Sequence, residues 1–316
     1  MDREVRTSFP RMIALCATAL LIACGGGSDA TGTPPDSLAA EGSATTLDIA
    51  NWNLEWFGAA GNGPADENLQ LQNVRAVIAA VDFDVWGLAE VVSDAQFNSL
   101  KAQLSGYDGF TADAASVTNG AAFYGASEQK LAVLYKKALA TLTAARIILT
   151  ENDNDFAGRP PLEVKLRINL NGRTQDLVVI VLHMKAFSDS ASWQRRVAAG
   201  AALKSYLDAT YPTQQVAVIG DWNDDVDASI SAGRASPYQS FVSDGARYTF
   251  PTAALSAAKL ASTVGNAEFI DHQLNTNELA ATYVAGSAKV YRADARINNY
   301  SATTSDHYAV LARYNF

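Results

Sequence analysis

The chain has 316 residues, of which 48% are hydrophobic and 18% are charged, and its formal net charge is −9. This composition excludes a disordered chain and supplies enough apolar side chains for a large core. The acidic balance argues against a protein that coats nucleic acid with a broad basic surface. The two cysteines are too few for a disulfide scaffold.

The N-terminal residues have the features of an export signal. Three arginines precede an apolar segment over residues 12–23, which is too short to cross a bilayer as a helix. The segment ends in Leu21-Ile22-Ala23-Cys24, which resembles the lipobox of bacterial lipoproteins. We therefore expect a signal peptide over residues 1–23, lipidation of Cys24, and anchoring in the cell envelope at the outer membrane. A cleaved signal in which Cys24 has no role is the alternative.

The chain after the signal divides into a linker and one domain. A stretch rich in Gly, Ser, Thr, Ala and Pro predicts a flexible tether over residues 24–45. Residues 46–316 contain no second linker and no internal repeat, so we expect a single domain there. Its periodicity predicts strands at 46–52, 85–89, 131–135, 162–168, 177–183, 216–220, 269–274 and 308–314, and helices at 67–81, 94–104 and about 190–211.

Two of these strands indicate the layering of the domain. Residues 178–182 and 216–219 are apolar at every position, which is typical of inner strands that are covered on both faces. Strands that alternate with helices then favour a two-sheet α/β sandwich over an all-β barrel. In the third helix, Arg195 and Arg196 either face a polyanion or lie on a solvated helix face, and we expect the solvated face.

Polar residues recur where apolar strands end. The chain has three histidines, and all three lie at these junctions. The junctions are Asn51-Trp52-Asn53, Ala89-Glu90, Leu182-His183, Gly220-Asp221-Trp222-Asn223, Ile270-Asp271-His272 and Ser305-Asp306-His307. One such residue alone is usually a solvated side chain, but six junctions on one sheet edge would form a single pocket.

Crowded carboxylates require a cation or a proton, because they repel one another. A ligand set of carboxylates and amides suits Mg²⁺, Mn²⁺ or Ca²⁺ rather than zinc. The sequence also lacks a Gly-x-Ser-x-Gly motif and a P-loop, so nothing in it indicates a covalent intermediate or a nucleotide-binding loop. The residues therefore predict a divalent-metal site at these junctions.

The same junctions, in the same order, resemble the endonuclease/exonuclease/phosphatase superfamily. Gly220-Asp221-Trp222-Asn223 and the C-terminal Ser305-Asp306-His307 are the most specific of them, and the resemblance covers nearly the whole domain. It implies a deoxyribonuclease I-like fold: a four-layered α/β sandwich of two packed mixed β-sheets flanked by helices, with the site at one end.

The resemblance also implies a role for each junction. Glu90 would be the principal metal ligand, with Asn53 and Asp306 in the same metal and phosphate site. Asp221 and Asn223 would hold the attacking water or the phosphate oxygens. Asp271 would orient His307 as the general base, and His183 would face the phosphate from the other side. These assignments are listed by type: catalytic His183, His307, Asp271, Asp221, Asn223 and Glu128; metal-binding Glu90, Asn53 and Asp306; substrate-binding Arg159.

Two of the assignments have weaker support, and a third residue, His272, receives none. Glu128 precedes a predicted strand at the place where deoxyribonuclease I-like relatives have an acid paired to the second histidine. Arg159 lies in Arg159-Pro160-Pro161, where relatives have an arginine that contacts phosphate. His272 stands where many relatives have an aromatic residue, and we expect it to have no catalytic role.

We expect a divalent-metal-dependent phosphodiester hydrolase, specifically a nuclease that acts on nucleic acid outside the cytoplasm. A sphingomyelinase-like or inositol-polyphosphate phosphatase activity is the alternative, and a catalytically inactive, tethered binding module is a third. No protein partner is evident. The choice of substrate would depend on residues 106–127 and 233–265, which we expect to form loops.

Overall fold

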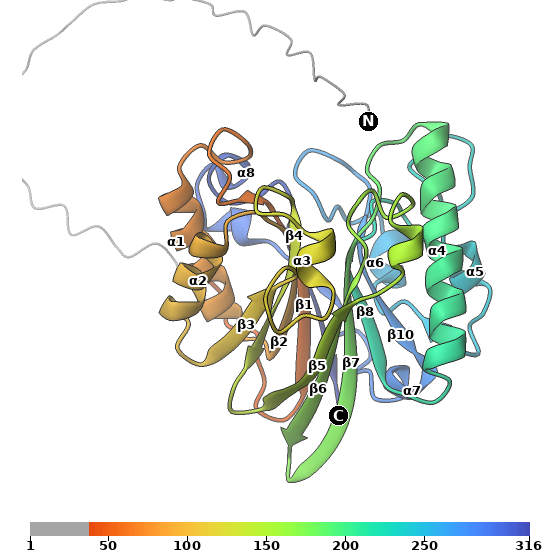
Figure 1. Ribbon diagram of the computed structural model, residues 1–316, viewed down its shortest axis with the longest axis horizontal. Helices are drawn as coiled ribbons and strands as arrows, with labels where there is room; N and C mark the ends of the chain where they lie inside the picture. The colour runs from red at the N-terminus through yellow and green to blue at the C-terminus, as the bar shows by residue number, and fades with distance from the viewer. Residues whose placement is uncertain (1–37) are drawn as a thin grey trace, which may run out of the picture. The chain divides into compact units, whose positions relative to one another are not determined.

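The computed structural model describes residues 38–316, which fold into two β-sheets packed face to face (Figure 1). The first sheet has the strand order β11-β12-β1-β2-β4-β3 and the second has β5-β6-β7-β8-β10-β9. Each sheet contains one parallel pair, β1 with β2 and β7 with β8, among antiparallel neighbours. The strands of the first sheet are β1 (Leu47–Phe57), β2 (Val85–Val91), β3 (Tyr107–Thr111), β4 (Lys130–Lys136), β11 (Lys289–Tyr291) and β12 (Ala309–Tyr314).

The second sheet carries the long β6–β7 hairpin. Its strands are β5 (Ala140–Ile147), β6 (Leu162–Leu170), β7 (Arg173–His183), β8 (Val216–Asp221), β9 (Tyr248–Thr249) and β10 (Asp271–Thr276). Apolar residues of both sheets meet in the centre, where the interface is so close that a Cβ on Gly87 of β2 would lie 2.7 Å from Ile219 Cδ1 of β8. A side chain at that position would therefore push against Ile219 and Val181 of the opposite sheet.

Helices cover the outer face of each sheet (Figure 1). One outer layer contains α1 (Glu67–Val81), α2 (Asp94–Gln103) and α8 (Tyr300–Thr303); the other contains α4 (Ser190–Thr210), α5 (Gln239–Val242) and α6 (Ala253–Ala257). The remaining short elements are α3 (Gly120–Phe123), α7 (Asn277–Ala280) and the 3₁₀ helices Thr150–Asn152 and Ala293–Ala295. The four layers confirm the predicted α/β sandwich of two mixed sheets.

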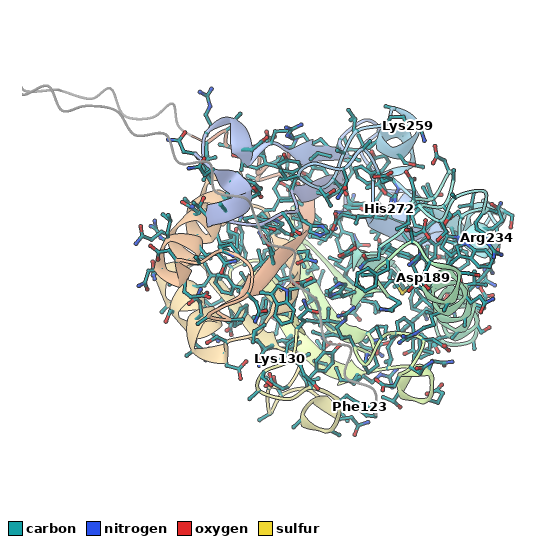
Figure 2. All side chains as sticks on the ribbon, turned by 90° about the horizontal axis from the view of Figure 1, so that it is seen from above. Phe123, Lys130, Asp189, Arg234, Lys259 and His272 are labelled. Atoms are coloured by element: carbon teal, nitrogen blue, oxygen red, sulfur yellow. The ribbon has the colours of Figure 1, made fainter. Side chains whose placement is uncertain are left out.

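The long helices begin at side-chain caps that can be read in the sequence. Asp66, Ser93 and Asp189 accept hydrogen bonds from the first free N–H groups of α1, α2 and α4. Figure 2 labels Asp189 at the start of α4. The predicted bounds of these helices are correct to within one residue.

The sequence analysis misses the strands at the edges of the sheets. β3 and α3 lie within residues 106–127, and α5, β9 and α6 lie within residues 233–265, so neither segment is the plain loop that we expected. β5 is also missed, because it is an edge strand with one exposed face and is built from Ala, Thr and Arg. Such strands lack the continuous apolar run that identifies inner strands.

Residues that precede the predicted start of the domain at residue 46 already contact the folded domain. Glu41 pairs with Lys289 at 2.5 Å and with Arg313, and the Gly42 N–H donates to the Val81 carbonyl at 2.7 Å. Residues 38–45 therefore belong to the folded unit rather than to the predicted tether. The signal peptide, the tether up to residue 37 and Cys24 lie outside the described residues. Over residues 38–316, no helix is long and apolar enough to cross a membrane.

Candidate active site

The polar junctions of the sequence meet at one end of the sheets. In the parallel pairs, Asn53 is opposite Ala89 and His183 is opposite Asp221, while antiparallel β10 places Asp271 opposite Asp221 as well. At this end of the two sheets, the carboxyl ends of the strands β1, β2, β7 and β8 lie beside the amino ends of β10 and β12. This edge is at the end of the sheets away from the C-terminus in Figure 1, and Figure 2 looks down onto it.

His307 and Asp271 form a buried pair at this edge. The His307 Nδ1–H donates to Asp271 Oδ2 at 2.8 Å, and the Ser262 hydroxyl donates to the same oxygen at 2.7 Å. Burial acts to lower the pKa of His307, but the carboxylates of Asp271 and Asp221 outweigh it and raise this pKa well above its usual value. The hydrogen bond fixes the imidazole so that Nε2 points toward the open site.

Asp221 lies between the two imidazoles. Its Oδ2 is 3.5 Å from His183 Nε2 and 3.8 Å from His307 Nε2, and its Oδ1 accepts the Asn223 N–H at 2.8 Å. Burial raises the pKa of Asp221 to about 7, although the nearby His307 acts to lower it. The two histidines, Asp221 and Glu90 therefore share one pocket, as His183 Nε2 is also 3.8 Å from Glu90 Oε1.

Asn53 holds two of these carboxylates in place. Its amide nitrogen donates to Glu90 Oε1 and to Asp221 Oδ2, each at 3.0 Å, while its Oδ1 accepts the Glu55 N–H at 3.0 Å. Two carboxylate acceptors leave only one sensible orientation for the amide. Asn53 thus lies in the predicted metal and phosphate site, where its amide group holds the carboxylates of Glu90 and Asp221 at a fixed separation.

Glu55 belongs to the site, and the sequence analysis misses it. Burial, together with the charges of Asp306 and Glu90, raises the pKa of Glu55 to about 7, and its Oε2 is buried without a hydrogen-bond partner. A carboxylate two residues after Asn53 on the same strand is the signal that would have identified it. Asp306 completes the group, with a half-exposed side chain whose Oδ1 is 3.8 Å from His307 Nε2.

The residues present fit a divalent cation. Glu55, Glu90 and Asp306 offer hard oxygen ligands that repel one another, and Glu55 Oε2 is an unpaired acceptor inside the group. A second set, Asp221, Asp271 and His307, places ligand atoms within 4.8 Å of one another. In this second set Asp271 Oδ2 already accepts two hydrogen bonds and orients His307, which leaves Glu55, Glu90 and Asp306 as the candidate cation ligands.

His183 lacks the partner that the resemblance implies. Its Nδ1 is buried with no hydrogen-bond partner, while Glu128 accepts the Gly125 N–H at 2.7 Å. Burial and the charges of Arg159 and His307 lower the pKa of His183 well below its usual value. The expected Glu128–His183 pair is therefore not formed, and His183 is a neutral imidazole.

Arg159 lies at the margin of the pocket. Its guanidinium donates to Gln129 Oε1 at 2.7 Å and to the Met184 carbonyl at 3.1 Å, and burial lowers its pKa despite the charges of Glu90 and Asp221. Its Nε has no hydrogen-bond partner. A guanidinium that interacts with the charges of Glu90 and Asp221 adds positive charge beside the pocket, which suits an anionic substrate.

Asn223 lies on a strained turn after β8. Its φ is +52°, and its side chain donates to the Met184 carbonyl at 3.1 Å. Gly220, three residues earlier, has φ +143°, and a Cβ there would collide with the Leu182 carbonyl. Glu55 and Glu90 also have positive φ, at +48° and +59°. Strain of this kind persists where the surrounding structure fixes a functional geometry.

His272 and Arg196 lie outside the pocket. His272 is next to Asp271 on β10 but points to the opposite face, where it packs against Phe250 and Phe269. Arg196 is fully buried and pairs with Asp224 at 2.8 Å, so it lies neither on the solvated helix face that we expected nor toward a polyanion.

Comparison with known proteins agrees with this arrangement. The sequence model of the Endonuclease/Exonuclease/phosphatase family matches residues 50–307, a segment that includes every residue of the pocket. A family match that spans most of the chain identifies the family independently of the geometry. No functionally curated protein matches the sequence significantly.

Solved structures share the fold at low sequence identity. An endonuclease/exonuclease/phosphatase from Bacteroides vulgatus is 17% identical with a TM-score of 0.59, over 85% of this chain and 98% of that one. The human nocturnin catalytic domain with bound sulfate is 18% identical with a TM-score of 0.56, over 85% and 93%. D. rerio TDP2 complexed with a single-strand DNA product is 13% identical with a TM-score of 0.58, over 86% and 100%. The chain belongs to the endonuclease/exonuclease/phosphatase family.

Proposed function

We propose that this protein is a divalent-metal-dependent phosphodiester hydrolase, and specifically a nuclease. The observation that carries the proposal is the proximity of two groups in one pocket: the His307–Asp271 pair and the carboxylates Glu55, Glu90 and Asp306. A proton acceptor beside a cation site is what attack of water on an anionic phosphodiester requires.

The side chains divide the work of hydrolysis. His307 Nε2 accepts a proton from the attacking water, and Asp271 holds the imidazole in the correct tautomer. Asn53 and Asn223 are fixed by hydrogen bonds and line the space next to Asp221. When bound, a divalent cation neutralises the phosphate and the carboxylates, and so brings the pKa of His307 back toward the range of a useful base.

His183 acts in the neutral form. Its low pKa means that it carries no proton to give up as an imidazolium at neutral pH. The Nε2–H, 3.5 Å from Asp221, instead donates a hydrogen bond to the phosphate as charge develops in the transition state. Arg159 supplies the positive charge on this side of the pocket.

Nucleic acid is the substrate class that we favour. A TDP2 structure with the same fold contains a single-strand DNA product, and nocturnin contains a sulfate anion. The chain has a formal net charge of −9, so we expect affinity to come from the pocket and its cation rather than from long-range attraction. We also propose export and lipid anchoring through Cys24, since Leu21-Ile22-Ala23-Cys24 resembles a lipobox.

The test is a cleavage assay with four substrates. The purified protein is incubated with plasmid DNA, RNA, sphingomyelin and inositol phosphates, with Mg²⁺ or Mn²⁺ and then with EDTA. We expect metal-dependent DNA or RNA cleavage that His307→Gln abolishes without a change in the far-UV circular dichroism spectrum. Cleavage of lipid headgroups or inositol phosphates alone would overturn the nuclease assignment, and activity in EDTA would overturn the metal mechanism.

A further inference from the structure

An aromatic ring lies exposed beside the pocket. Phe187 is 51% exposed, and the other large apolar side chains that are exposed within residues 38–316 are Val242 and Leu260. Phe187 follows His183 by four residues, in the segment that leads from β7 to α4. A single exposed apolar side chain is ordinary on a protein surface, so the significance of Phe187 rests on its backbone conformation and on its place beside Asn223.

The surrounding structure forces Phe187 into this position. Its φ is +80°, a conformation that is rare for a bulky side chain. Buried Arg196 holds the segment, because its Nη1 donates to the Lys185 and Phe187 carbonyls, each at 2.7 Å. Arg196 is itself fixed by buried Asp224. The hydrogen bonds from Arg196 thus hold the strained backbone of Phe187 in place, and strain of this kind is concentrated at functional sites.

The same segment is tied to the catalytic residues. The Met184 N–H donates to the Asp221 carbonyl at 2.9 Å, and the Met184 carbonyl accepts from Asn223 and Arg159. The ring of Phe187 is therefore held at a fixed offset from the pocket. Lys185 Nζ is 4.5 Å from the centroid of the ring and adds a positive charge there.

Phe187 also lines a cavity that shares Asn223 with the site. The cavity has a volume of about 410 Å³ and is lined by Phe187, Asn223, Ile230, Asn266 and Glu268, among others. This volume lies in the range of small-molecule sites. One wall is an aromatic ring, and Asn266 and Glu268 offer an amide and a carboxylate that can pair with the edge of a heterocycle.

We propose that Phe187 is a stacking platform for the nucleobase next to the scissile phosphate. The inference rests on the proposed nuclease function and names the part of the substrate that this cavity takes. A single ring in a cavity with polar walls suits one base, whereas insertion into a bilayer uses a broad apolar face with basic residues around it. Stacking gives affinity without basic charge, which an acidic nuclease needs.

Defined oligonucleotides test the proposal. Each oligonucleotide has one cleavable phosphodiester, and all its other linkages are phosphorothioates. The intact version keeps the bases on both sides of the cleavable phosphate, and each of two further versions has an abasic residue on one side of it. For the intact oligonucleotide, Phe187→Ala should raise KM about tenfold, the loss expected for one base–aromatic stack, with kcat little changed. Phe187→Trp should restore KM, and Val242→Ala, which removes a 42% exposed side chain on α5, should have no effect.

The abasic substrates separate stacking from a structural role. If Phe187 stacks on a base, one abasic substrate should show the raised KM with wild-type protein, and Phe187→Ala should add nothing to it. Equal losses on intact and abasic substrates would overturn the proposal. Failure of the wild-type protein to cleave any oligonucleotide would instead overturn the nuclease function, so the two failures are distinguishable.

A binding measurement in EDTA provides a readout that is independent of turnover. With 2-aminopurine at the base position, fluorescence should be quenched on binding to wild-type protein and to Phe187→Trp, but not to Phe187→Ala. Unchanged quenching with Phe187→Ala would overturn the proposal. Loss of binding to phosphatidylcholine vesicles in Phe187→Ala, with oligonucleotide quenching intact, would assign the ring to a lipid surface instead.

Discussion

His307 Nδ1 lies 2.8 Å from Asp271 Oδ2, although 36 residues separate them in the chain. The carboxylate of Asp271 contributes to the raised pKa of His307. Asp271→Asn should therefore lower the pKa of His307. The acidic limb of the pH–rate profile should move to lower pH, because His307 then stays unprotonated at lower pH values. It should also reduce kcat by about 10²–10⁴-fold, the range for loss of general-base catalysis.

Asp176→Asn is the matched control for that variant. Asp176 is an exposed carboxylate on β7 that pairs with Arg167 on the same sheet. This variant should keep both kcat and the pH profile of the wild-type protein. An Asp271→Asn profile that keeps its acidic limb would contradict the role of Asp271 in setting the proton affinity of His307.

Removal of charge at Glu90 should weaken metal binding. Glu90→Gln keeps the shape of the side chain and one acceptor for the Trp56 N–H, at the loss of the hydrogen bond from the Asn53 amide, so folding is checked by circular dichroism. We expect Mn²⁺ affinity, measured by isothermal titration calorimetry, to fall by at least 10–100-fold, the loss seen even for residues that only support metal ligands. Glu128→Gln should leave Mn²⁺ affinity unchanged, and equal affinity of wild-type and Glu90→Gln protein would refute the assignment.

Glu55 should destabilise the metal-free protein above pH 7. Its pKa is about 7 in the folded protein and 4.5 without the surrounding structure. The folded state thus binds the proton more tightly, and stability falls as the pH rises from about 4.5 to 7. In EDTA at pH 8, Glu55→Gln should therefore raise Tm. Addition of Mg²⁺ should then raise the Tm of this variant by less than it raises the Tm of the wild-type protein. A lower Tm for Glu55→Gln in EDTA would count against this carboxylate being held for a cation.

His272 should make the protein sensitive to acid. Burial lowers its pKa from 6.5 to about 3, so only the unfolded state takes up this proton between those values. Stability is then lost as the pH falls from about 6.5 toward 3, by up to about 1.4 kcal/mol per pH unit. Urea unfolding in EDTA should show that His272→Gln reduces the loss between pH 7 and 4.5 by roughly 2–3 kcal/mol. An unchanged loss in His272→Gln would mean that other groups dominate acid unfolding.

The pair of Arg196 and Asp224 should be a major stability determinant. Both side chains are fully buried, and Asp224 has no other cationic partner in the described part of the chain. Arg196→Met should cost about 3–5 kcal/mol of unfolding free energy, because it leaves a buried charge unpaired. The double variant Arg196→Met/Asp224→Leu should recover part of that loss, and the surface variant Arg167→Met should cost less than about 1 kcal/mol. Equal stability of the single and double variants would contradict the explanation.

Much of this protein was readable from its sequence, because the relevant signals are local. The bounds of α1, α2 and α4 follow from apolar periodicity and from caps such as Asp66 and Asp189. The inner strands are continuous apolar runs, and each ends in a polar residue such as Glu90 or His183. Since parallel strands place their carboxyl ends at one edge, the gathering of these residues could be predicted without coordinates.

Tertiary structure alone decided which polar groups meet. Glu128 has the right position in the sequence yet bonds to Gly125, which leaves His183 Nδ1 without a partner. Arg196 looks like a surface residue on α4, but the loop that carries Asp224 closes over it. Phe187 is exposed because its backbone is held at positive φ by that same arginine. Such outcomes depend on packing between segments that are distant in the chain, and helix or strand periodicity carries no information about them.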